Sequence, residues 1–414
     1  MRATTLLRIL LALKHSRVTG FRFGEAGIEV EAALSTRVPF CSVCMCRARR
    51  VYDQRRRKWR HLDAAGMQMT LFYDQRRVDC RRCGVVVELV PWAEPGSRFT
   101  RDFEDQVAYL AQVMDQTTVC NTMRISWVTV GEIVERVVAR LGPTDRLDGL
   151  EHIGIDELSY RRHHEYITTV VDHVARKVVW AAPGKNAATV RKFLRALGAE
   201  RAAKLKTVTM DMSAAYIEAV EKGASQARIV FDHFHVLRLV QDALDKVRRE
   251  QVALQAGTDD AKALKKSRWA LLKNPWNMNA VERDKLAEVQ RDNRSLFRAY
   301  MLKESLAEIL SRRQVNVVRD KLDAWTNWAM RSRLDPFKKV ARTLRRHFEG
   351  IVAFVATGLS NGLIEGLNGK VRTITRRAYG FHSPHRLISF IFLCCSGLTL
   401  HPIFKTPDLH PLQL

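Results

Sequence analysis

The sequence predicts a multidomain α/β protein, in which small N-terminal modules precede a mixed α/β region and a long all-α insertion. Three observations support this organisation: two Cys-x2-Cys pairs between residues 41 and 83, three short helical patterns between residues 101 and 141, and short strand patterns that begin near residue 150. At 414 residues the chain is also too long for one ordinary hydrophobic core. We therefore expect two to four domains.

The overall charge favours an anionic partner. Lys and Arg number 69 against 44 Asp and Glu, which gives a formal net charge of +25 and a pI near 10.1. Such a field attracts polyanions, and nucleic acid is the natural one. No apolar run reaches the roughly 18 residues needed to cross a bilayer. Because Arg8 also interrupts the faintly signal-like start of the chain, we expect a cytoplasmic, nucleoid-associated protein.

The eight cysteines are clustered, which in a reducing compartment indicates metal binding rather than disulfides. Two Cys-x2-Cys pairs, 35 residues apart, have the spacing of a zinc ribbon within an N-terminal region that spans residues 1–90. The predicted zinc ligands are Cys41, Cys44, Cys80 and Cys83. Four thiolates complete a closed tetrahedral site, so we treat His61 as a non-ligand, although Cys46 could compete. Twelve Lys or Arg against four Asp in residues 47–82 predict a surface that contacts phosphates.

The next segment predicts a helix-turn-helix domain over residues 98–142. Two prolines and a glycine in residues 91–97 indicate a linker, and we expect a new domain to start after it. Three short helical patterns follow. The last one, residues 127–140, has a single apolar stripe and is preceded by Ser126 at the position of an N-cap. We expect the N-terminal part of this helix to enter a major groove of DNA.

Beyond residue 142 the pattern changes to α/β. Strands are predicted at residues 153–158, 166–172, 177–182, 207–211 and 228–232, and a helix at residues 187–197. Asp156 and Asp211 lie in or at the end of apolar strands, where a buried charge needs a partner or a metal. Taken alone, either acid could instead have a structural capping role. Residues 237–340 then form the all-α insertion, and we expect its tryptophans in the core: Trp269, Trp276, Trp325 and Trp328.

Residues 361–374 carry one polar face when they are projected on a helix. This face holds Asn361, Glu365, Asn368 and Arg372. Three glycines within the same stretch weaken the helix by roughly 0.8–1 kcal/mol each relative to alanine, which suggests that something approaches the backbone closely there. They are Gly362, Gly366 and Gly369. The alternative is an ordinary exposed amphipathic helix.

Five stretches give the sequence a specific resemblance to a known family. They are Gly154–Tyr160, Asp211–Val220, Phe231–Val236, Ser360–Asn368 and Arg376–Phe381, in this order. Together they resemble the DDE-type insertion-sequence transposases, which have an N-terminal zinc ribbon, a helix-turn-helix and a ribonuclease-H-like catalytic core interrupted by a helical insertion. The resemblance covers nearly the whole chain and implies core segments at residues 150–236 and 341–414. One departure is Met45 and Cys46, because the family usually has glycine after the first cysteine pair.

By this resemblance, Asp156, Asp211 and Glu365 form a catalytic triad that binds Mg²⁺ or Mn²⁺, for which carboxylates are the preferred hard ligands. The residues that would support these ligands or position DNA are Asp232, His235, Asn361, Asn368, Lys370 and Arg372. For His235, a hydrogen-bonded position in the core is an open alternative. Glu157 follows Asp156 on the same strand, so we expect its side chain to point to the opposite face and to stay out of the site.

The resemblance implies a transposase that nicks insertion-sequence ends and joins the freed 3′-hydroxyl to target DNA. Its partner would be double-stranded DNA, at the terminal inverted repeats and at the target. Synapsis of two ends makes a homo-oligomer the expected assembly. Two alternatives stay open: a zinc-containing DNA-binding regulator whose ribonuclease-H-like domain is non-catalytic, and a nuclease that cuts branched DNA without joining ends.

Overall fold

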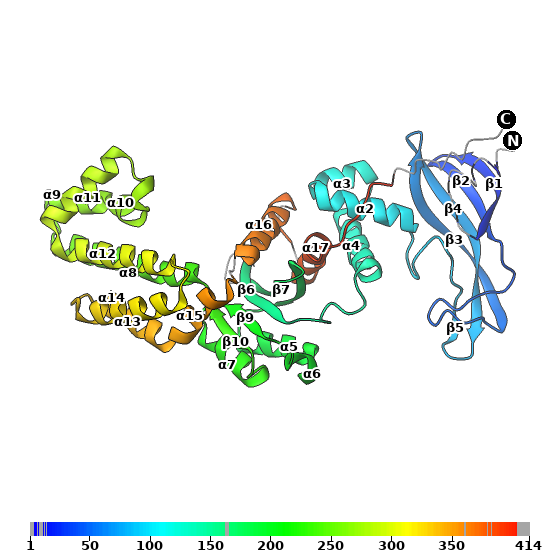
Figure 1. The fold of residues 1–414 in the computed structure, drawn as a ribbon. Coiled ribbons are helices and arrows are strands. Elements are labelled where there is room, and N and C mark those ends of the chain that lie inside the picture. The colour runs from blue at the N-terminus through cyan, green and yellow to red at the C-terminus, as the bar shows by residue number, and fades with distance from the viewer. Residues whose placement is uncertain are drawn as a thin grey trace, which may run out of the picture. The chain divides into compact units, whose positions relative to one another are not determined.

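The computed structural model describes the chain apart from residues 1–3, 6, 8–10, 12, 14, 162–164, 360–361, 379, 382 and 404–414. The chain divides into two compact units, and Figure 1 shows the elements of both. The first unit contains residues 1–142 and 398–414, and the second contains residues 143–397. We describe each unit by itself.

A five-stranded sheet forms the first part of unit 1. Its strands are β1 (Ser16–Gly24), β2 (Gly27–Leu34), β3 (Arg50–Ala64), β4 (Met67–Cys80) and β5 (Gly84–Val87). They follow the order β1-β2-β4-β3, and β5 pairs with β4. Val30, Trp59 and Leu71 point into its core and are at most 1% exposed. The strand β4 ends at Cys80, which places the second cysteine pair at the turn into β5.

Residues 91–97 were expected to be a linker, and this prediction is wrong. Trp92 and Ala93 are buried, and the Trp92 ring packs edge-on against Trp59 and Tyr73 at centroid distances of 5.6 and 5.5 Å. Burial of the large Trp92 ring stabilises the sheet, and this gain exceeds the conformational entropy that a flexible linker would keep. The stretch therefore closes the core of the sheet.

Three helices follow in unit 1: α2 (Arg101–Val113), α3 (Gln116–Met123) and α4 (Trp127–Leu141). Each begins at a side-chain cap, and the Ser126 oxygen accepts from the Thr129 N–H as its sequence position predicts. The fully buried carboxylate of Glu104 on α2 accepts a hydrogen bond of 2.8 Å from Arg136 on α4. This ion pair fixes α2 against α4, since a buried charge without a partner is strongly unfavourable.

Unit 2 contains a second five-stranded sheet in the order β10-β9-β6-β7-β8. Its strands are β6 (His152–Arg161), β7 (Glu165–Asp172), β8 (Lys177–Pro183), β9 (Thr207–Met210) and β10 (Arg228–Phe231). The first three are antiparallel, whereas β9 and β10 run parallel to β6. The helices between them are α5 (Ala187–Leu197), α6 (Ala199–Ala202) and α7 (Ala214–Gly223). This is the ribonuclease-H-like arrangement that the resemblance implied.

A helical region follows β10. Its elements are α8 (His233–Leu254), α9 (Asp259–Lys266), α10 (Arg268–Leu272), the 3-10 turn η1 (Pro275–Asn277), α11 (Ala280–Asp292), α12 (Arg294–Leu310), α13 (Val315–Arg331), α14 (Asp335–Arg346) and α15 (Phe348–Thr357). Of its four tryptophans only Trp325 is in the core, at 2% exposure. The expectation is wrong for the others, because Trp269, Trp276 and Trp328 are 63%, 77% and 39% exposed.

Two helices complete unit 2: α16 (Gly362–Arg377) and α17 (Pro384–Cys395). Helix α16 packs on β6 through Ile364, which is fully buried. A Cβ added to Gly154 would lie 2.2 Å from the Ile364 Cδ1 atom, so glycine is required on the strand at this contact. The glycines of α16 itself are different, because no atom of the described residues beyond the adjoining helix backbone would lie within 4 Å of a Cβ at Gly366 or Gly369. At these two positions the close approach that the glycines suggested is therefore not made by any described part of the chain.

No single helix among the described residues is long and apolar enough to cross a membrane. Among the described helices, only the pair α15 and α16, bent by 90° relative to each other, is together long and apolar enough to match a membrane span in length and composition.

Candidate active site

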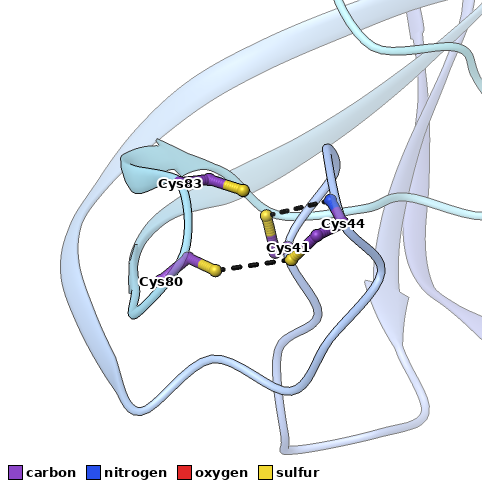
Figure 2. Close-up of side chains that lie close together, drawn as sticks. All are labelled: Cys41, Cys44, Cys80 and Cys83. Atoms are coloured by element: carbon purple, nitrogen blue, oxygen red, sulfur yellow. Dashed lines mark hydrogen bonds between the residues drawn. The ribbon is translucent and has the colours of Figure 1, made fainter.

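The two cysteine pairs of unit 1 meet at one point. All four Sγ atoms lie within 4.8 Å of one another, and Figure 2 shows them facing a common centre. The Sγ atoms of Cys44 and Cys80 are 3.5 Å apart, close to the sulfur–sulfur separation of about 3.8 Å in a tetrahedral zinc site with Zn–S bonds near 2.3 Å. Backbone N–H groups of Arg82 and Cys83 lower the pKa of Cys80 to about 7, whereas burial raises the pKa of Cys83 to about 12, so Cys80 is the thiol that most readily becomes the thiolate that binds metal. The donors fit a closed structural zinc site.

The two other candidates near the ribbon do not join this cluster. Cys46 is exposed, and its backbone carbonyl accepts from the Cys41 N–H at 2.9 Å. His61 is buried, with its Nδ1 atom 2.8 Å from the Thr100 hydroxyl that caps α2. Among the described residues, the zinc ligand set therefore consists of the four cysteines of the two pairs.

The first two acids come together at neighbouring parallel strands of unit 2. Asp156 lies on β6, and Asp211 follows the last residue of β9. The Asp156 carboxylate accepts from the Glu157 N–H at 2.8 Å and from the Asn368 side-chain amide at 2.7 Å. Burial raises the pKa of Asp156 and the negative charge of Asp211 raises it further, while the two donors and His235 oppose the shift. The two carboxylates are thus close enough to repel one another.

Glu157, the neighbour of Asp156, was expected to lie on the opposite face and outside the site, and its charge nevertheless interacts with both acids. Its side chain does point to the other face of β6, because it is hydrogen-bonded to Tyr216 on α7 whereas Asp156 contacts α16. Nevertheless burial, followed by the charges of Asp211 and Asp156, raises the pKa of Glu157 to about 7. The alternation of side chains along β6 places Glu157 and Asp156 on opposite faces. Asp211 follows the end of the neighbouring strand β9 and interacts with both.

The third acid, Glu365, is exposed in the first turn of α16. It follows Ile364, which anchors the helix against Gly154, and it precedes by three positions Asn368, whose amide holds Asp156. Residues three apart on a helix have Cβ atoms about 5–6 Å apart. The contact between Asn368 and Asp156 therefore brings Glu365 to the edge of the same site, although no contact of its carboxylate with the other acids is formed.

The motif around β10 divides into structural and site residues. Asp232 is buried and caps α8 by accepting from the Phe234 N–H at 3.2 Å. His233 is the core histidine, since both its ring nitrogens lie near carbonyl oxygens, those of Leu310 at 3.0 Å and Ile351 at 3.2 Å. His235 is half-buried and lies near enough to Asp156 to lower its pKa. The position of His235 therefore agrees better with a role beside the acids than with a hydrogen-bonded position in the core.

Two of the remaining predicted residues, Lys370 and Arg372, lie on α16. Lys370 donates to the Cys394 carbonyl oxygen at 2.5 Å and so links α16 to α17. Arg372 is exposed. Asn361 lies outside the described residues. The sequence had not singled out Tyr216 or Gly154, and only the structure reveals what they contact.

Carboxylates are suitable ligands for divalent metal ions, but the carboxylates of this site do not converge on one point in the structure. Within the described part of the chain, the four cysteines are the group in which three or more metal-binding side chains converge. Burial, and after it the negative charge of Asp211, instead raises the pKa of both Asp156 and Glu157. Like charges at short range are unfavourable until a cation neutralises them. Such repulsion between acids is expected at a site that binds a hard cation through carboxylates from several strands and helices.

Comparison with known proteins agrees with this geometry. Residues 153–391 match the DDE-type model of the ISL3 family, described as a transposase. Residues 88–138 match the helix-turn-helix domain of transposase family ISL3, and residues 37–83 match the zinc finger of the transposases of IS204, IS1001, IS1096 and IS1165. These three matches follow the order of the modules along the chain.

Curated relatives point the same way. A transposase for insertion sequence element IS1557 from Mycobacterium tuberculosis is 40% identical over 364 residues, which cover 82% of each chain. A transposase for insertion sequence element IS1001 from Bordetella parapertussis is 28% identical over 351 residues, covering 84% of this chain and 86% of the relative. These likenesses favour a DNA-cutting and DNA-joining enzyme over a non-catalytic regulator.

Proposed function

The chain belongs to the ISL3 family of DDE transposases, and we propose that Asp156, Asp211 and Glu365 are the acids that perform its DNA cleavage and strand transfer. The observation that carries the proposal is the hydrogen bond from Asn368 to Asp156, because it brings the helix of Glu365 to the strand of the first acid. Two bound Mg²⁺ or Mn²⁺ ions would activate the attacking oxygen and stabilise the leaving oxygen.

The residues around the acids hold them in place. The Asn368 amide and the Glu157 N–H each donate to one oxygen of Asp156, which fixes the orientation of its carboxylate. Asp211 accepts from the Ser213 N–H at 3.0 Å at the start of α7. His235 adds a polar group beside Asp156, suited to orienting a ligand or a DNA phosphate. Supporting groups of this kind commonly contribute 10–100-fold in metal affinity or activity.

We propose that unit 1 recognises the DNA ends. Residues 98–142 present the start of α4, where Val128 is 59% exposed and could contact a thymine methyl group in a major groove. The ribbon adds phosphate contacts. Four of its twelve cations, Arg56, Arg60, Arg76 and Arg77, form ion pairs within the unit, so the others supply most of the attraction. Synapsis of two ends would require two copies of the chain.

The test is a nicking and strand-transfer assay on a cloned element end with Mg²⁺. Asp156→Ala, Asp211→Ala and Glu365→Ala should each lower both activities by at least about 10²-fold, the scale for loss of one transition-state-stabilising group. End binding should persist, because it is assigned to unit 1. The control is Glu218→Ala, which removes an exposed α7 carboxylate paired with Lys222.

Two results would overturn this assignment: full activity in any one of the three variants, or equal loss in the Glu218→Ala control. Nicking without joining in the wild-type protein would instead identify a nuclease. Glu157→Ala cannot serve as the control, since its carboxylate interacts with Asp211.

A further inference from the structure

Two tryptophans are exposed in a short stretch of the helical region. Trp269 on α10 is 63% exposed and Trp276 in η1 is 77% exposed. By contrast, Trp325 of the same region is buried and donates its indole N–H to the Leu302 carbonyl at 2.9 Å. A single exposed apolar side chain needs no explanation, but two exposed tryptophans on consecutive elements indicate a binding surface.

Positively charged side chains predominate in the sequence around these rings. Residues 261–281 contain five cations and no Asp or Glu: Lys262, Lys265, Lys266, Arg268 and Lys273. The guanidinium of Arg268 lies 5.3 Å from the centre of the Trp269 ring. Three of these cations pair with carboxylates outside the stretch: Lys262 with Asp259, Arg268 with Asp245 and Lys273 with Glu282. Lys265 and Lys266 are exposed in the last turn of α9. The surface therefore combines aromatic faces with an excess of positive charge.

The backbone that presents the rings is held firmly. Lys303 on α12 is only 3% exposed, and its Nζ atom lies 3.1 Å from both the Leu271 and Lys273 carbonyl oxygens at the end of α10. Leu271 and Met278 are buried beneath the stretch. Helices α9, α10 and α11 gather at one end of the long α8 and α12 (Figure 1). The two rings thus stand on a fixed platform, which lowers the entropic cost of binding.

We propose that Trp269 and Trp276 stack on unpaired bases of DNA, while the neighbouring lysines contact the phosphates of the same strand. Base faces are hidden inside a paired duplex, so a ring that stacks on them selects an unpaired stretch. The exposed Lys265 and Lys266, together with the Arg268 guanidinium beside Trp269, favour a polyanion as the partner. This inference rests on the proposed function only in assuming that the substrate is DNA.

The test compares the full-length protein on two labelled DNAs of equal length, one fully paired and one with a central run of unpaired thymines, at fixed salt. Wild type should prefer the unpaired probe. Trp269→Ala and Trp276→Ala should each weaken binding to that probe by about 5-fold or more, since stacking contributes 1–3 kcal/mol per base, and should leave the paired probe unaffected. Trp269→Phe and Trp276→Phe should keep most of the preference.

The matched control is Trp328→Ala, because this tryptophan is also exposed but lies on α13, outside the basic stretch. An unchanged preference in the doubly substituted Trp269→Ala/Trp276→Ala protein would overturn the proposal, as would an equal loss on both probes, which would indicate a duplex or protein contact. If wild type bound neither probe and nicked no element end, the proposed function itself would fail. Nicking by wild type together with no preference for unpaired DNA would defeat only this inference.

Discussion

The cysteine site of unit 1 and the carboxylate site of unit 2 both join residues far apart in the sequence, but only the first is closed without a ligand. Its four sulfur atoms already lie within 4.8 Å of one another. In the second, Asp156 is held by Asn368 while Glu365 is exposed. Four cysteines that are mostly neutral thiols can converge with little charge repulsion, whereas two carboxylates 4 Å apart repel by about 4 kcal/mol near a protein surface. A structural metal site can thus be preformed, while an acidic catalytic site stays open until cations bind.

The largest effect that tests this contrast is loss of zinc. Structural zinc contributes about 10–16 kcal/mol of apparent binding free energy in small zinc-finger peptides. Cys80→Ser should therefore lower the zinc content well below one ion per chain and unfold the ribbon, which metal analysis and thermal unfolding would measure. The control Cys46→Ser removes an exposed thiol outside the cluster and should retain zinc. A Cys80→Ser protein with full zinc would contradict the ligand assignment.

The second effect is stabilisation of unit 2 by Mg²⁺. A ligand at a hundred times its Kd raises the free energy of unfolding by about 2.7 kcal/mol. Calorimetry should show this gain in wild type and in Glu218→Gln, whose carboxylate is exposed, but not in Asp156→Asn. Without metal, Asp156→Asn should be at least as stable as wild type, because the repulsion from Asp211 is removed. If Asp156→Asn kept the full gain, the ions would bind elsewhere.

A smaller effect concerns how α16 is positioned. In Gly154→Ala the new Cβ would lie 2.2 Å from Ile364 Cδ1 and 2.8 Å from the Thr209 hydroxyl oxygen. Such overpacking costs about 1–3 kcal/mol. We expect α16 to shift and nicking to fall more than end binding. Adding Ile364→Val removes the Cδ1 atom and should restore part of the activity, which a double-mutant cycle would measure. Full nicking by Gly154→Ala alone would show that this contact does not position Glu365.

Much of the fold could be predicted because its signals are local. Helix α5 begins and ends where the sequence indicated, since the Asn186 side chain caps it and Gly198 follows its last residue. The strands of unit 2 agree with their β-branched patterns within a few residues. Burial was harder to predict. Trp92 is buried and Trp269 is exposed because of residues that are distant in the sequence. The residues next to each tryptophan along the chain do not indicate whether it is buried.

The site was predictable in its residue types but not in its contacts. Strand alternation correctly separates the side chains of Asp156 and Glu157, yet it says nothing of Asp211, which approaches from beyond the neighbouring strand. Likewise the glycines of α16 suggested a close contact, whereas the glycine that a neighbour requires is Gly154 on β6. Sequence patterns describe one element at a time, and a catalytic site depends on distances between elements.

The smallest predicted effect concerns the open space beside Glu365. Apart from the adjoining helix backbone, no atom in the described part of the chain would lie within 4 Å of a Cβ at Gly366. Gly366→Ala should therefore fit and should raise the free energy of unfolding by about 0.8–1 kcal/mol through helix propensity. Because this exposed position adjoins the proposed triad, we expect the DNA backbone to occupy the space. Nicking should then fall from glycine to alanine to leucine while thermal stability stays above that of wild type. If activity were unchanged across the series, the space would be unused by DNA, and Gly366 would be only a weak point in an exposed amphipathic helix.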